Sequence, residues 1–320
     1  MLLKSLVKIS CWLCWSRAPG PAGEPEGDIM HDHVAAKSKS TRTHHAIGTY
    51  ARAYPLGYSQ GEFRRLEQQS ELFADLTAEL LRRAGIREEM RILDVGCGVG
   101  DVSLLAGRLV GSAGSVLGID RSADAVKTAK RRAIAAGLHH VTFAACELDA
   151  FGTEHLFDAV IGRLVLMYMP HPAATLRLLS CHLRPGGIMA FQEMAMPGCR
   201  SIPEGPLFRR CLEWIMGTLE RGGFETDMGG KLFSTFLAAK LPAPKMVSVS
   251  HIDGGAKSPV YEYIAETVRS LLPMMERLGV ATDGDVLVET LAHRLREEAI
   301  ALRTCVMLPP LVGAWVRTQV

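Results

Sequence analysis

Short apolar runs and helical patterns alternate through the middle of the chain. Strands are predicted from apolar runs at residues 90–95, 115–119, 141–145, 159–162 and 187–192. Helices are predicted, from apolar residues at three- and four-residue steps, at 103–110, 122–136 and 172–183. Such alternation is typical of a parallel sheet whose faces are covered by helices. We therefore expect an α/β fold that binds its ligand at the carboxyl ends of the strands.

The flanking segments complete the expected domain organisation. Helical spacing predicts one helix at 62–84 and further helices at 207–219, 233–239, 261–278 and 286–300. An apolar run near 246–252 predicts another strand, and the last strand is expected at 305–308 or a little beyond. The expected domains are a flexible leader at 1–46, a ligand-binding core at 47–200, helical cap insertions with one core strand at 201–300, and the last core strand at 301–320.

The leader is expected to be flexible because Pro, Gly and polar residues dominate it after residue 18. Its uncharged stretch at 9–15 is far too short to span a bilayer, so we expect no stable membrane insertion. Met30 opens a polar run, and we hypothesise that it is the true start of the protein.

The composition and the charge of the chain limit the kinds of partner that it is expected to bind. The 320 residues are 48% hydrophobic with a formal net charge of +2 and mixed signs, which gives no field that would favour nucleic acid. The eight cysteines are scattered, several of them in apolar runs, which indicates reduced thiols and a cytoplasmic setting. Cys11 and Cys14 have metal-ligand spacing but no second ligand pair, so we expect no metal. We expect a monomer or homodimer.

A glycine-rich loop lies where the first predicted strand meets the first helix. It reads Asp94-Val-Gly96-Cys97-Gly98-Val-Gly100. Glycine removes the side chains that would obstruct a ligand approaching the backbone. A tight turn without a ligand would use the same residues, but the strand-then-helix context favours a binding loop.

Asp120 follows Gly100 by twenty residues, at the end of the second predicted strand. A carboxylate there can accept both hydroxyl groups of a ribose, which predicts a nucleoside ligand. The alternative role is a cap for the helix that starts near Ser122. The loop and the carboxylate occur together, which favours the ribose.

The loop disfavours a pyrophosphate. Asp101 stands where the third glycine of the dinucleotide fingerprint GxGxxG would fall. A carboxylate in the first turn of a helix competes for the amides that a pyrophosphate needs. S-adenosylmethionine has an adenosine but no phosphate, and its amino-acid end can use the loop backbone and Asp94.

At this point the residues resemble a known family. The segments are Ile92–Gly100 (ILDVGCGVG), Gly118-Ile-Asp120, Phe157-Asp-Ala-Val-Ile161 and Leu183-Arg-Pro-Gly-Gly187. Together they resemble the class I S-adenosylmethionine-dependent methyltransferases, especially small-molecule enzymes of the ubiquinone and natural-product kind. The resemblance implies a Rossmann-like seven-stranded, mostly parallel sheet whose last strand is antiparallel, with helices on both faces.

The resemblance also assigns residues to the cofactor S-adenosyl-L-methionine. Around the methionine part it places Asp94, Gly96, Cys97, Gly98 and Gly100. It places Asp120, beside Arg121, on the ribose, and Glu147, beside Leu148, on the adenine amino group. After the fourth strand, relatives often carry a histidine-bearing segment, where this chain has the segment from Arg163 to Tyr168, and Arg163 is expected to contact the cofactor. Tyr58 and Gln68 belong to a pre-sheet segment that can close over the amino-acid end.

Methyl transfer needs in-line placement and exclusion of water more than it needs an elaborate catalytic group. Proximity and orientation supply about 7–11 kcal/mol of barrier reduction. The apolar helices of the expected cap could form the pocket for a small organic acceptor, although the same residues could be ordinary core. If the acceptor needs a general base, the candidates near strand ends are Tyr168, His171, Glu193 and His251.

Two other functions are compatible with this pattern. An NAD(P)-dependent oxidoreductase uses a similar sheet, but Asp101 opposes the pyrophosphate. The other is a non-catalytic protein that binds the cofactor only to regulate a partner; the intact loop with Asp120 opposes this interpretation but does not prove turnover.

Overall fold

The computed structural model describes residues 55–56 and 60–318. The expected leader with Cys11, Cys14 and Met30 lies outside the described residues, as does Tyr58. Gln68 falls in the helix α1, but its side chain also lies outside the description.

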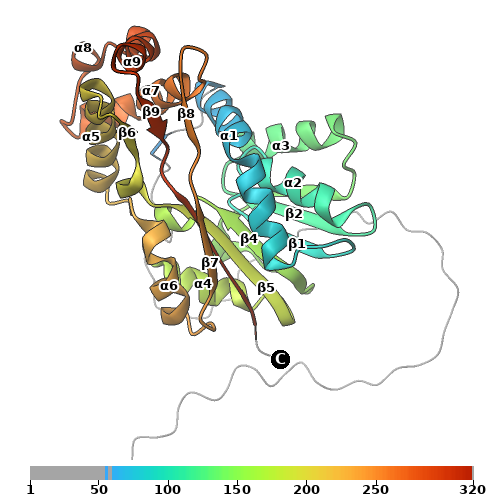
Figure 1. The fold of residues 1–320 in the computed structure, drawn as a ribbon. Helices are drawn as coiled ribbons and strands as arrows, with labels where there is room; N and C mark the ends of the chain where they lie inside the picture. The colour runs from blue at the N-terminus through green and yellow to red at the C-terminus, as the bar shows by residue number, and fades with distance from the viewer. Residues whose placement is uncertain (1–54, 57–59, 319–320) are drawn as a thin grey trace, which may run out of the picture. The chain divides into compact units, whose positions relative to one another are not determined.

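A seven-stranded sheet forms the centre of the described part of the chain (Figure 1). Five parallel strands follow the predicted order: β1 (Arg91–Val95), β2 (Ser115–Asp120), β3 (Val141–Ala145), β4 (Phe157–Arg163) and β5 (Leu183–Met194). Beyond β5 lies β10 (Leu311–Arg317), antiparallel to β5 and to the edge strand β7 (Lys245–Val249). The order β3-β2-β1-β4-β5-β10-β7 confirms the predicted Rossmann-like, mostly parallel sheet.

Helices cover both faces of this sheet. The helices from the first half of the chain are α1 (Gln60–Ala84), α2 (Asp101–Val110) and α3 (Ala123–Ala135). Two later helices contact β5, namely α4 (Pro172–Ser180) and α6 (Met228–Ala238). Adjacent residues of β1 show that both faces are buried: Ile92 packs in the cluster that α2 and α3 cover, and Leu93 in the cluster that α4 and α6 cover. Strands buried on both faces are continuous apolar runs, which explains why they were predicted correctly.

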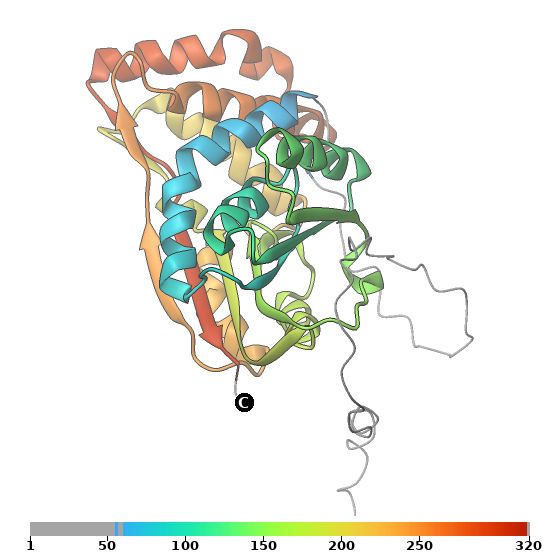
Figure 2. The same ribbon diagram turned by 90° about the vertical axis from the view of Figure 1, so that its right-hand side faces the viewer.

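A second group of elements gathers at one end of the sheet (Figures 1 and 2). Its helices are α5 (Pro206–Arg221), α7 (Val260–Arg277), α8 (Asp283–Val286) and α9 (Val288–Leu302). They accompany a three-stranded antiparallel sheet of β6 (Arg200–Ile202), β9 (Cys305–Met307) and β8 (Ile252–Gly254). We call the helices α5, α7, α8 and α9 with this small sheet the cap. The helix α1 joins the cap to the main sheet, since its Phe73 packs edge-on against Tyr263 of α7.

Three sequence predictions differ from this structure. The run near 246–252 divides into β7 of the main sheet and β8 of the small sheet. The segment 305–308 is largely β9 of the small sheet, and the last core strand is β10, which begins after Pro309 and Pro310. The predicted helix 233–239 belongs to α6, which packs against β5 and β10 of the main sheet. Apolar periodicity locates such elements but does not tell which sheet they join.

Within residues 60–318 no helix combines the length and the apolar character needed to cross a membrane.

Gly162 provides a test of how closely β4 and β5 pack. A Cβ atom on Gly162 would lie 2.6 Å from Cε1 and 3.0 Å from Cδ1 of the Phe191 ring. We expect Gly162→Ala to lower the free energy of unfolding by about 1–3 kcal/mol, because the rigid ring must move within a packed core. Denaturant melts would measure this.

Gly152→Ala is the matched control, since a Cβ atom there meets no heavy atom within 4 Å. We expect its stability to stay within about 0.5 kcal/mol of the parent chain. Equal stabilities of the two variants would contradict the described packing.

Candidate functional site

A cavity of about 450 Å³ lies between the carboxyl ends of the parallel strands and the cap. Its lining comes from the segments after β1, β2, β3 and β4, from the start of α1, and from α5 and α7. This is the edge at which sheets of this kind bind ligands.

The glycine loop after β1 supplies one wall of the cavity. Gly96 and Gly98 both line it, with φ of +66° and +52°. A Cβ atom on Gly98 would meet no heavy atom within 4 Å, so the backbone there borders open space. The backbone at Gly98 therefore leaves room for a ligand, and its contact with one stays a prediction.

Gly100 has a different role from the one predicted. It does not line the cavity. A Cβ atom on Gly100 would lie 3.0 Å from Ala129 of α3 and 3.0 Å from the Phe143 ring of β3. Its φ of +91° is also a conformation that favours glycine. Gly100 therefore lets the start of α2 pack against α3 and β3.

Asp120 lines the cavity from the end of β2. One carboxylate oxygen accepts the Gly98 amide at 2.9 Å, and the other accepts the Ser122 amide at 2.8 Å. Burial raises the pKa of Asp120, and these two amides oppose the rise. A carboxylate has about four acceptor positions, so two are left for further donors. The cap of α3 is supplied by Ser122, whose side chain accepts from the Ala125 amide.

Asp94 lies beneath the loop and does not line the cavity. Its carboxylate accepts a hydrogen bond from Ser103 Oγ at 2.6 Å. Burial raises the pKa of Asp94 to about 7, and the Ser103 hydroxyl group and Arg163 oppose the rise. Asp94 thus ties the end of β1 to α2, in contrast to the predicted contact with the methionine part.

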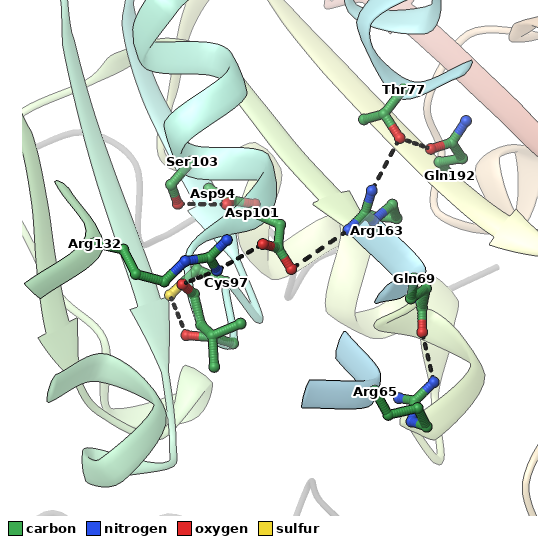
Figure 3. Close-up of polar contacts among 12 residues, drawn as sticks. Arg65, Gln69, Thr77, Asp94, Cys97, Asp101, Ser103, Arg132, Arg163 and Gln192 are labelled. Carbon is green, nitrogen blue, oxygen red and sulfur yellow. Dashed lines mark hydrogen bonds and ion pairs between the residues drawn. The ribbon is translucent and has the colours of Figure 1, made fainter. Parts of the chain in front are cut away.

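A chain of polar contacts runs along the wall formed by α2, β4 and α1 (Figure 3). Asp101 lies 2.6 Å from Arg132 of α3, which also donates to the Val99 carbonyl group at 2.7 Å. The other carboxylate oxygen of Asp101 is 4.0 Å from Arg163 Nη2, and Arg163 Nη1 donates to Thr77 Oγ1 at 3.2 Å. Asp101 and Arg163 both line the cavity.

Arg163 is buried, with only 8% of its side chain exposed. Burial lowers the pKa of its guanidinium group, while Asp101 and Asp94 raise it. Arg163, a predicted cofactor residue, therefore places a buried positive charge beside Asp101 at the cavity. Such a pair can bind the two charges of an amino acid.

Two further lining residues, Arg65 and Gln69, come from α1 and were missed as site residues from the sequence. Arg65 donates to Gln69 Oε1 at 2.7 Å, and both are buried (Figure 3). The spacing of these residues along the sequence could have identified them. Arg65, Gln69 and Thr77 fall at four-residue steps from the buried Phe73, so they share its helix face.

The remaining predicted cofactor residues line the same cavity. Cys97 lies within the glycine loop, Arg121 directly follows Asp120, and Glu147 and Leu148 follow β3. Glu147 is exposed and Leu148 is half-buried at the start of the short helix η1 (Leu148–Ala150). Burial raises the pKa of the Cys97 thiol well above its usual value, so this thiol stays protonated.

Of the four candidate bases, only Tyr168 lines the cavity. It lies in η2 (Leu166–Tyr168), with its ring edge-on to Phe224. His171 is exposed at the N-terminus of α4, and His251 lies between β7 and β8, 3.9 Å from Asp253. The structure therefore does not bring His171 or His251 to the site.

Glu193 lies behind the cavity wall. It is fully buried, and its Oε1 accepts the amides of Val165 and Leu166 at 3.0 and 2.8 Å. Burial raises its pKa to about 7, although these amides oppose the rise. Val165 and Met167 of this segment line the cavity, so Glu193 positions the loop after β4 and does not itself face a ligand.

Among the described residues, no group of three or more His, Cys, Asp and Glu side chains is placed to hold a metal ion.

The comparisons with known proteins agree with one another, since each of them finds methyltransferases. Residues 86–214 match the family model described as a methyltransferase domain. A trans-aconitate 2-methyltransferase from Methylobacterium nodulans is 34% identical over 134 residues, which are 42% of this chain and 48% of that protein. A ubiquinone biosynthesis O-methyltransferase from Albidiferax ferrireducens is 29% identical over 168 residues, 52% of this chain and 62% of that protein. The chain thus spans less than two thirds of the length of either relative.

The fold has solved relatives as well. The crystal structure of the YcgJ protein from Bacillus subtilis matches with a TM-score of 0.50 and 15% identity, and the match covers 77% of this chain and 99% of that one. This likeness supports the arrangement of the sheet and its helices.

The pKa of Glu193 predicts a dependence of stability on pH. Because the folded-state pKa is raised, the folded protein binds more protons than the unfolded chain between about pH 4 and pH 7. Stability therefore falls as the pH rises through this window and levels off above it. In Glu193→Gln, which keeps an oxygen for the two amides, we expect a shallower fall.

Urea melts near pH 5 and near pH 8 would measure the difference in the free energy of unfolding. Part of the fall should remain in the variant, since Asp94 also has a raised pKa. The exposed Glu213→Gln is the control and should keep the full fall. An unchanged fall in Glu193→Gln would contradict the assignment.

Proposed function

Since the chain carries a class I S-adenosylmethionine-dependent methyltransferase domain, we propose that it transfers the methyl group of S-adenosyl-L-methionine to a small organic acceptor. One observation carries this proposal. The open backbone at Gly98 and the carboxylate of Asp120 are joined by a hydrogen bond and face the same cavity.

The residues of the cavity fit the parts of this cofactor. Asp120 has acceptor positions for the two ribose hydroxyl groups. Arg163 and Asp101 offer opposite charges for the carboxylate and ammonium groups of the methionine part. Glu147 and Leu148 are placed after β3, where they would contact the adenine.

The cofactor, when bound, supplies a methyl group on a positively charged sulfur. Asp120, Arg163 and Asp101 would hold the cofactor, whose methyl group would then be available to a lone pair of the acceptor atom, with an uncharged thioether left on the cofactor. Any proton on the acceptor atom is released. The chain's own contribution is to orient both molecules in the cavity and to exclude water, which the cap helices α5 and α7 favour.

The dinucleotide alternative is opposed by Asp101. Its carboxylate stands in the first turn of α2, is only 7% exposed, and lines the cavity. A pyrophosphate at that helix terminus would meet a buried negative charge. Calorimetry with S-adenosylhomocysteine and with NAD, each added to the full chain, separates the two proposals.

Asp120→Ala tests the ribose contact. We expect affinity for S-adenosylhomocysteine to fall about 10- to 100-fold, because two hydroxyl groups and the Gly98 amide lose a charged acceptor. Asp124→Ala, on the exposed face of α3, is the control and should bind as the parent chain does. Parent-like affinity in Asp120→Ala would contradict the assigned site.

Gly98→Val tests the close approach of the loop. We expect saturable binding of S-adenosylhomocysteine to be lost, because a branched side chain would enter the space beside the backbone. Gly137→Val is the control for backbone strain, since Gly137 has a similar φ of +69° and also open surroundings, but does not line the cavity.

Calorimetry of both glycine variants, after a check of their melting temperatures, gives the result. Loss of binding in both variants would indicate that strain alone is responsible. Binding retained in Gly98→Val would place the cofactor elsewhere.

A further inference from the structure

The two walls of the cavity differ in charge. The wall built from the strand ends and α1 carries the charged lining residues, which are Arg65, Asp101, Asp120, Arg121, Glu147, Asp149 and Arg163. Among the lining residues that follow Glu193 in the chain there is no Asp, Glu, Lys, Arg or His. We call this second set of lining residues the cap wall.

The helices α5 and α7 provide most of the cap wall. Phe208, Leu212, Ile215 and Leu219 of α5 fall at three- and four-residue steps, so one face of the helix lines the cavity. Ile264 and Leu271 of α7 line it from the neighbouring helix. An unpaired charge on a bound molecule would find no opposite charge here.

The polar groups of the cap wall are the hydroxyl groups of Tyr263 and Thr267 and the thiol of Cys199, and none of them is a cationic side chain that would pair with a carboxylate. The hydroxyl group of Thr267 donates to the Tyr263 carbonyl group of its own helix at 2.8 Å. Burial raises the pKa of Cys199 to about 12, so its thiol remains neutral. Met194 and Met196 add polarizable thioether groups, which suit apolar and aromatic partners.

In the proposed function, the charged wall faces the cofactor. Arg163 lies between Asp101 and Thr77, and Arg65 is bonded to Gln69 of α1. In the proposed function these groups lie around the amino-acid end of S-adenosylmethionine. The space that remains for the acceptor is enclosed by the cap wall.

We propose that the methyl acceptor is an uncharged, predominantly apolar molecule, and that carboxylated acceptors are excluded by the cap wall. This inference rests on the proposed function. Burying a carboxylate without a partner is far more costly than burying an uncharged ring of the same size. The name of the trans-aconitate relative implies a carboxylated acceptor for that protein, and the cap wall makes a different class the expectation here.

A matched pair of fluorescent probes tests the inference. The full chain is first saturated with S-adenosylhomocysteine and then titrated with 2-naphthol or with 6-hydroxy-2-naphthoate, which differ by one carboxylate. We expect 2-naphthol to bind at least about tenfold more tightly. Equal or tighter binding of the naphthoate would overturn the inference, and so would the absence of saturable 2-naphthol binding.

A charge placed in the cap wall should change the preference. Leu212 lines the cavity and is half-buried, so Leu212→Lys adds an ammonium group there. We expect the preference for 2-naphthol to fall by about tenfold or to reverse. Glu213→Lys, on the exposed side of the same helix, is the control and should keep the parent preference. An unchanged preference in a Leu212→Lys variant that still binds S-adenosylhomocysteine would count against the cap wall.

The outcomes separate this inference from the proposed function. If the parent chain does not bind S-adenosylhomocysteine, the proposed function fails. If it binds S-adenosylhomocysteine but prefers the naphthoate, only the acceptor class is wrong. If Leu212→Lys does not fold, the comparison of the two probes on the parent chain still decides.

Discussion

The hydrogen bond from the Gly98 amide to Asp120 joins the two strand ends on which the cavity is built. It follows directly from the parallel register of β1 and β2, which also brings the Cys97 amide to the Ile119 carbonyl group at 3.0 Å. Arg132 holds the other side of the loop through the Val99 carbonyl group. The shape of the loop is therefore set by contacts within the chain, which lowers the entropy lost when a ligand binds.

Much of the core could be predicted because its strands are buried on both faces. Such strands are uninterrupted apolar runs, and the helices between them show their own periodicity. The glycine loop and Asp120 were identifiable for a related reason. Their positions follow from the order strand, loop, helix, strand, which is local in sequence. The side of the cavity formed by the strand ends could therefore largely be predicted from the sequence.

The features of the fold and of the site that the sequence did not predict depend on contacts between segments far apart in the chain. Spacing alone could not show that Gly100 packs against Ala129, or that Glu193 holds the amides of Val165 and Leu166. Both residue types suit a binding site as well as a packing role. Likewise, β9 and β10 have similar apolar character, and only their partners show that they belong to different sheets. Arg65 was not named as a site residue because an arginine near the start of a helix, here directly after Arg64, is usually exposed.

The order of elements along the chain divides the cap into two inserts. The helix α5 lies between β5 and β7, and α7 to α9 lie between β7 and β10, so each group leaves the main sheet and returns to it. Replacing these inserts would change the α5 and α7 side of the cavity without disturbing the strands that carry Gly98 and Asp120. The two inserts can therefore vary in sequence and length while the strand ends that carry Gly98 and Asp120 keep their arrangement.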